Sequence, residues 1–195
     1  MKNIDDIVVR EEKKSDYEYP TPGMVDAICC GIWNVGIQKV EYMGDVKYRN
    51  KIVIGFILDQ VSEKTGAPMI QYETVGLSLF EKSKLYQIIK SWTSKTIPDD
   101  ERSNYDLKPF VGKKATLNLV QNNEYINIGA VLPPQQSNKV ELIDPFNGET
   151  HPFVRKMLEK SAQAVLEKEA IDANKKVNLS EIKPLDSDKN KKAPF

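Results

Sequence analysis

From Lys51 to Leu58, the side chains fall into two sets that alternate along the chain with a period of two. This pattern limits the choice of fold more than any other pattern in the sequence. A period of two is that of an extended strand and not of a helix. One side carries Ile52, Ile54, Phe56 and Leu58, and the other carries Val53, Gly55 and Ile57. The sequence therefore predicts a β-rich domain that contains this strand.

Segments on either side of this strand also favour extended structure. Gly31 and Gly36 interrupt the first of them, and a glycine inside a strand usually marks a bulge. We expect a polar connection at residues 43–50, between the first strand and the second. The four further strands are expected at residues 24–40, 69–79, 113–120 and 125–132.

The period changes after Phe80, where apolar residues recur at helical spacing. This spacing predicts one helix, whose start Ser78 or the residues just after it can cap, and Pro98 favours a second, short helix. Three strands, a helix and two more strands is the order of an OB-fold. We therefore predict a mainly β fold, a five-stranded OB-fold barrel with a helix between strands 3 and 4. The apolar positions of the first helix are Leu85, Ile88, Ile89 and Trp92, and Trp92 is expected in the core.

The parts of the chain outside the predicted barrel differ from it in composition. We expect a flexible N-terminal arm at 1–20, the nucleic-acid-binding OB-fold at 21–134, and a linker with an amphipathic C-terminal helix at 135–185. That helix is expected to pack on the barrel or to pair with another copy of the chain, as a homo-oligomer. Residues 186–195 lack periodicity and predict a flexible, disordered tail.

Length, hydropathy and charge narrow the classes of protein. A chain of 195 residues, 40% of them hydrophobic, suits one domain with extensions. It has no apolar run near the roughly 18 residues that a membrane span needs, and its first residues do not resemble a signal peptide. We expect a cytoplasmic protein that does not bind membranes. The formal net charge is zero, so any binding of nucleic acid must rest on a local positive surface.

The residues that usually carry catalysis or bind metal are scarce. The chain has one histidine, His151, in a polar, loop-like context. Its two cysteines, Cys29 and Cys30, are adjacent, and neighbouring side chains of a strand point to opposite faces and cannot easily form a disulfide. These are too few for a zinc site or a histidine-centred triad. A run of acids at 99–101 suits a nuclease site less well than a helix cap. We expect no enzymatic activity, no cofactor and no metal.

The segment Lys47–Lys51 interleaves positive charge with an aromatic ring. Single-stranded nucleic acid needs both, because phosphates attract cations and unpaired bases stack on flat rings. In OB-folds this connection and the one between strands 4 and 5, here Asn122 and Asn123, flank the binding face. Lysines in hairpins are also commonly just solvated, and Trp33 also suits a cover over the end of a barrel. The nucleic-acid-binding candidates are Trp33, Tyr42, Lys47, Tyr48, Arg49, Lys51, Tyr72, Lys113, Lys114 and Tyr125.

Several short motifs inside residues 20–134 resemble a family of phage replication-region proteins that are regarded as single-stranded-DNA-binding OB-folds. They are Thr74–Leu85, Ser91–Trp92, Tyr105–Leu107, Val111–Ala115 and Tyr125–Ile128. The resemblance implies a protein that binds and protects single-stranded DNA without strong sequence preference during phage DNA replication or recombination, in the host cytoplasm. Residues 93–95 are less basic than the matching loop of that family, so this loop is not assigned a DNA contact.

The chain ends Ala193-Pro194-Phe195, which is similar to the terminal Pro-Phe of bacterial single-stranded-DNA-binding proteins. A terminal phenylalanine can place its ring in a partner's pocket while a basic residue there binds its carboxylate. Pro194 and Phe195 are therefore candidates for binding replication or recombination proteins, although lysines stand where that family has acids. The alternative function is an OB-like protein–protein adaptor of such a complex with little DNA binding, which the zero net charge favours.

Overall fold

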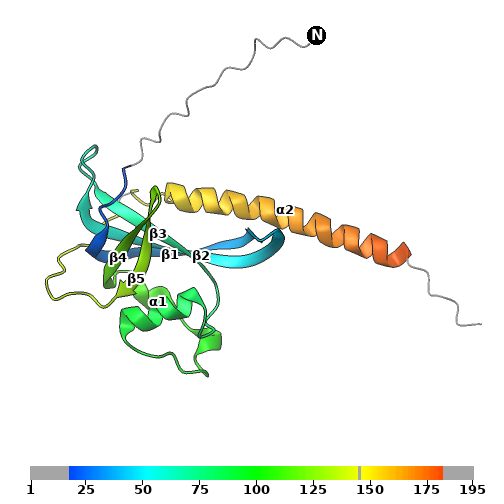
Figure 1. The fold of residues 1–195 in the computed structure, drawn as a ribbon, viewed down its shortest axis with the longest axis horizontal. Helices are drawn as coiled ribbons and strands as arrows, with labels where there is room; N and C mark the ends of the chain where they lie inside the picture. Colours follow the sequence, from blue (N-terminus) through cyan, green and yellow to red (C-terminus); the bar gives the residue numbers. More distant parts are fainter. Residues whose placement is uncertain (1–17, 145, 182–195) are drawn as a thin grey trace, which may run out of the picture.

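Five antiparallel strands form a single sheet in the order β3-β2-β1-β4-β5 (Figure 1). A computed structural model describes residues 18–144 and 146–181. The fold is therefore mainly β, with one helix between β3 and β4 and a second after β5. The strands are β1 (Gly23–Tyr42), β2 (Asp45–Val61), β3 (Pro68–Gly76), β4 (Lys114–Asn122) and β5 (Tyr125–Leu132), and the helices are α1 (Lys84–Thr93) and α2 (Pro152–Glu181).

The inner face of the sheet holds the main hydrophobic core. The predicted alternation in β2 is confirmed, because Ile52, Ile54, Phe56 and Leu58 are all buried in this core. Helix α1 begins at an N-cap, Ser83, whose side chain accepts a hydrogen bond from the backbone N–H of Tyr86. Trp92 is buried as predicted, and its Nε1 donates to the carbonyl of Lys114 at 2.8 Å.

The sheet is not closed into a barrel, which leaves the predicted OB-fold barrel unconfirmed. Among the described residues, β3 has a backbone ladder only with β2, and β5 only with β4. One side chain bridges the open seam, since Gln71 Nε2 donates to the carbonyl of Ile126 at 2.7 Å. The expected strand order, helix position and antiparallel pairing are present, but the last set of strand-to-strand hydrogen bonds is not.

The expected polar connection at residues 43–50 is wrong, because this segment is mostly strand. β1 and β2 continue as a paired hairpin out to Tyr42 and Asp45, and only Met43 and Gly44 form the turn. Both turn residues have positive φ, 50° and 82°, as a type I′ hairpin turn requires. We call residues 37–50 the arm. Both of its sides mix polar with apolar residues and are mostly exposed, so it lacks the burial by which the sequence revealed the other strands.

Helix α2 lies on the outer face of the sheet and runs alongside the arm (Figure 1). Val154 packs there with Val35 and Val53 in a second, smaller cluster. Further along the helix, the carbonyl of Met157 accepts a hydrogen bond from buried Gln38. The prediction that this helix packs on the sheet domain is therefore confirmed, and it extends from residue 152 to 181, beyond its expected apolar positions.

Other boundaries differ modestly from expectation. The bulges predicted at the glycines of β1 coincide with register shifts between Cys29 and Gly31 and between Asn34 and Ile37. In place of a helix starting at Pro98, two short 3₁₀ helices occur, η2 (Arg102–Asn104) and η3 (Lys108–Phe110). Among the described residues, no helix is both long enough and apolar enough to cross a membrane.

Candidate nucleic-acid interface

Three cations follow one side of β2 where the arm joins the sheet. Lys47 and Arg49 are exposed and Lys51 is half-buried. Alternate residues of a strand point to the same side and lie about 6.6 Å apart along it. Within residues 18–144 and 146–181, no ion pair is found for any of the three. The predicted Lys47–Lys51 cluster thus forms a row of positive charge with no acidic partner among the described side chains.

Tyr48, the ring of that cluster, lies on the other side of β2 from the cations. Its hydroxyl donates to Glu167 on α2 at 3.3 Å, and Lys39 Nζ donates to the same carboxylate oxygen at 2.8 Å. The hydrogen bond between Lys39 and Glu167 raises the pKa of Lys39 and lowers the pKa of Glu167. Tyr48 therefore ties the arm to α2 and is separated from the row of cations.

Trp33 and Tyr72, the predicted stacking rings of β1 and β3, meet on the outer face beneath the start of α2. The ring of Trp33 lies over Gly55, where a Cβ would stand 2.9 Å from Trp33 Cζ3. The ring of Tyr72 stacks on Phe153 of α2, with 4.7 Å between ring centroids and 15° between ring planes. Part of each predicted ring surface is thus already used by contacts within the chain.

His151 is buried among these rings, contrary to its expected loop-like and polar surroundings. Its ring centroid is 4.5 Å from that of Trp33 and 4.4 Å from that of Phe146, and its Nδ1 is 3.0 Å from Tyr72 Oη. Burial lowers the pKa of His151, and the opposing charge of Asp144 offsets this only in part. The neutral ring is therefore the favoured form in the fold.

Sequence reasoning missed Phe146, His151 and Phe153 as parts of this surface. They come from the non-periodic linker after β5 and from the first turn of α2, and they reach β1 and β3 only through long-range packing. The one available signal was the density of aromatic side chains between residues 146 and 153, in a segment that is otherwise polar.

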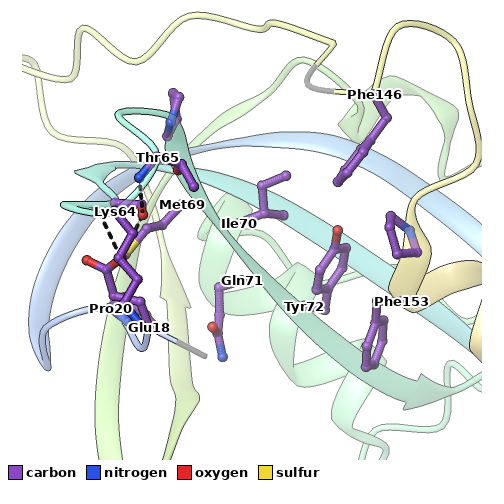
Figure 2. A pocket seen from close by; sticks show the side chains of 13 residues that line it. Glu18, Pro20, Lys64, Thr65, Met69, Ile70, Gln71, Tyr72, Phe146 and Phe153 are labelled. Atoms are coloured by element: carbon purple, nitrogen blue, oxygen red, sulfur yellow. Dashed lines mark hydrogen bonds between the residues drawn. The ribbon is translucent and has the colours of Figure 1, made fainter. Parts of the chain in front are cut away.

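A groove of roughly 600 Å³ continues from these rings along the edge strand β3, lined by Ile70 and Tyr72 from its outer side and by Met69 and Gln71 from its other side. Figure 2 shows Tyr72, Phe146 and Phe153 toward one end of it, Glu18 and Lys64 at the other, and Ile70 between them. Glu18 accepts hydrogen bonds from Ser62 and from the backbone of Glu63, which lowers its pKa. The groove is thus mainly apolar and aromatic on the sheet, with polar residues at its far end.

The row of cations starts at Lys51, on the face of the sheet that carries Ile70 and Tyr72 of the groove, and continues into the arm. In β2, Lys47, Arg49 and Lys51 share their side with Val53, which packs under α2. In the pairing of β2 with β3, Lys51 stands opposite Gly76 and Val53 opposite Thr74. A path therefore runs from the aromatic groove past Thr74 to the arm. We call it the outer strip, made of Ile70, Tyr72, Thr74, Lys51, Arg49 and Lys47.

The remaining sheet candidates lie apart from one another. Lys113 and Lys114 are at the start of β4, whereas Tyr125 pairs with Asn122 at its other end, about 26 Å away along the strand. Lys113 Nζ lies 5.1 Å from the centroid of the Phe110 ring, and Lys114 Nζ donates to the carbonyl of Asn138. These lysines and Tyr125 therefore do not form one cluster, because nearly the whole length of β4 lies between them.

Two further aromatic candidates are largely exposed. Tyr125 is 61% exposed and meets Tyr19 edge to face, at 6.2 Å between ring centroids. Tyr42 is 70% exposed and lies at the tip of the arm, six residues along β2 from the level of Lys51. The partner-binding candidates Pro194 and Phe195 lie outside the described residues.

The cysteines match their expected role as unbridged thiols. Cys29 is buried and Cys30 half-buried, and both are free. Burial raises the pKa of Cys29 to about 12 and that of Cys30 to about 11, so neither is a thiolate near neutral pH. Within the described ranges, no three His, Cys, Asp or Glu side chains come together as metal ligands.

Comparisons with known proteins add no family assignment. A scan against protein-family models finds no match to the chain, and neither does a search of curated proteins.

Proposed function

We propose that this protein binds single-stranded DNA without strong sequence preference and without catalysis, as part of phage DNA replication or recombination. The outer strip carries this proposal. It offers an aromatic groove and a row of cations along one face, which is the combination that unpaired bases and phosphates need. Bases of a duplex are stacked and paired, so such a face favours the single strand.

The strand order supports an OB-like binding mode. An OB-fold has five strands, with its helix between strands 3 and 4, and this chain has the same order with one seam left open. In such folds, the loop between strands 1 and 2 borders the binding face. Here that loop is the arm, which carries Arg49 at its base and is followed directly by Lys51 in β2.

A titration of a dye-labelled oligo-dT at several salt concentrations tests the proposal. Removing two phosphate contacts with Arg49→Ala and Lys51→Ala together is expected to weaken binding and to flatten the slope of log affinity against log salt by up to about 1.4. The matched control removes the same charge elsewhere, with Lys82→Ala and Lys90→Ala, whose side chains are exposed at and before α1. The proposal is wrong if the wild type does not bind at low salt, or if both double variants bind alike.

A protein–protein adaptor is the second candidate function. The apolar character of the groove, with Ile70, Phe146 and Phe153 exposed to it and Glu18 at one end, is the observation that favours it. In that case, the oligo-dT titration is expected to show no binding at low salt. Metal-dependent cleavage of the oligonucleotide would instead point to an enzyme.

A further inference from the structure

Helix α2 has a second apolar stripe beside the face that packs on the sheet. Leu158 is 44% exposed and Leu166 is 68% exposed, and Ala162 between them is also exposed. At about 100° per residue, Arg155 and Glu169 fall on the same stripe, and all five side chains lie within about 40° of Ala162 around the helix axis. Both charged residues are exposed, and Arg155 Nη2 also lies 3.8 Å from a carboxylate oxygen of Glu149 in an ion pair within the chain. The stripe is thus a continuous surface of two leucines and an alanine, with a charge at each end.

The packed face of α2 is a different one. Its residues Val154, Met157 and Ala164 are buried or half-buried, and a Cβ on Gly36 of β1 would clash with Ser161 Oγ. The centre of this face is about 120° from Ala162, a third of a turn. Covering the stripe therefore leaves the contacts between α2 and the sheet in place.

The stripe is symmetrical in spacing and size but opposite in charge at its two ends. Starting at Arg155, the steps to Leu158, Ala162, Leu166 and Glu169 are three, four, four and three residues. A leucine stands on each side of the central alanine, and the ends are a cation and an anion. A surface with this pattern is complementary to itself when one copy is turned end for end.

We infer that two copies of this chain pair through α2 as antiparallel helices, with the two-fold axis at Ala162. Arg155 of each protomer then meets Glu169 of the other, so both ends of the interface, about 21 Å apart, carry an ion pair. Leu158 of each protomer packs on Leu166 of the other. Ala162 meets its own copy at the centre, where a small side chain lets the helix axes approach closely.

The charges decide the direction of pairing and the kind of partner. Parallel helices in register would set Arg155 against Arg155 and Glu169 against Glu169, which repel. A membrane surface is a poorer partner, because helices that lie on anionic lipid are rich in Lys and Arg. Residues 152–173 of α2 carry four basic and four acidic side chains. A second copy of the chain satisfies both the apolar stripe and its charges.

Sedimentation equilibrium of the full chain without DNA, over a concentration series, tests this pairing separately from the proposed DNA binding. The interface is small, so we expect a reversible dimer with a Kd in roughly the micromolar range. Arg155→Glu and Glu169→Arg are each expected to raise that Kd about ten-fold, because each turns two attractions into repulsions. The double variant exchanges the charges and is expected to return to within about three-fold of the wild type.

A charge reversal on the other side of the helix is the matched control. Lys160 is exposed and lies about 160° from Ala162, so Lys160→Glu is expected to leave the Kd unchanged. Far-ultraviolet circular dichroism checks that every variant is folded. A wild type that stays monomeric at all concentrations, or a double variant as weak as the single ones, overturns the inference.

Oxidative cross-linking gives a second, independent readout. In a Cys30→Ser background, Ala162→Cys puts two thiols at the two-fold axis and is expected to form a disulfide dimer rapidly. Lys160→Cys in the same background is the control and is expected to cross-link slowly. Equal rates for the two variants would contradict the proposed axis.

Discussion

The two faces of the sheet are built from alternate residues of the same strand, yet they are covered in different ways. On the inner face, Ile54 and Phe56 belong to one large core that all five strands and α1 share. On the outer face, Val53 belongs to a small cluster under α2, and the surface beyond it is a groove and a row of cations. The inner face fixes the fold, while the outer face leaves room for a partner.

Truncating a side chain of the inner face is expected to have the largest effect on stability. Ile54 is 1% exposed, and Ile54→Ala is expected to lower the free energy of unfolding by about 2 to 5 kcal/mol, since it leaves a cavity in the shared core. Urea unfolding followed by circular dichroism measures this. A loss below about 1 kcal/mol would show that the core is loosely packed at this position.

The neighbouring residue on the outer face provides the matched comparison. Val53 is fully buried, and Val53→Ala is expected to cost about 1 to 2.5 kcal/mol, because fewer groups surround it and α2 can adjust. Amide hydrogen exchange in the first turns of α2 is expected to speed up more than exchange in β4. Equal acceleration in both elements would mean that the two faces are one cooperative unit.

Acid is expected to weaken the outer face before the inner one. Because burial lowers the pKa of His151 below its ordinary value of 6.5, the unfolded chain binds more protons at mildly acidic pH than the folded one. The contribution of neutral His151 to the free energy of unfolding is therefore fully present above about pH 6.5. It is lost as the pH falls through that value toward the pKa of His151 in the folded state. The carboxylates of Glu18 and Glu167, whose pKa values are lowered from 4.5, affect stability only at lower pH.

The variant His151→Gln isolates this effect, since glutamine keeps a hydrogen-bonding group near Tyr72 but does not titrate. The drop in urea midpoint between pH 7.5 and 5.5 is expected to be larger for the wild type than for His151→Gln. Parallel curves for the two proteins would contradict a buried, neutral His151.

The same contrast explains what the sequence could predict. The strand at residues 51–58 was predicted from its alternation, and the bounds expected for the fifth strand, 125–132, match those of β5. Burial leaves a pattern in both segments, as a continuous apolar run in β2, which is buried on both faces, and as an alternation in β5. The arm has no such pattern, because its backbone is paired while both of its sides mix polar with apolar residues and stay mostly exposed.

The candidate site was predictable only in part, for a related reason. The row of Lys47, Arg49 and Lys51 follows from local sequence and strand geometry. The surroundings of Trp33 and Tyr72 depend on His151 and Phe153, which arrive from nearly 80 or more residues away in the chain. No local pattern records such a contact, so the packing of α2 over these rings emerged only from the folded structure.

The arm allows the smallest and most local prediction. Met43 has a φ of 50° at the turn and is 88% exposed, so replacing it removes little packing. Asparagine adopts this left-handed conformation more readily than methionine, and Asn-Gly is the preferred pair for a type I′ turn. Met43→Asn is therefore expected to stabilise the arm by about 0.5 to 1 kcal/mol and to slow its amide hydrogen exchange about two- to five-fold.

The control variant is Met43→Ala, which removes the same side chain without gaining any preference for positive φ. Exchange in its arm is expected to match the wild type or to be faster. Since the arm has no buried face of its own, the turn and the contacts with α2 are what hold its two strands in register. If Met43→Asn leaves the exchange of the arm unchanged, the contacts with α2 alone determine its stability.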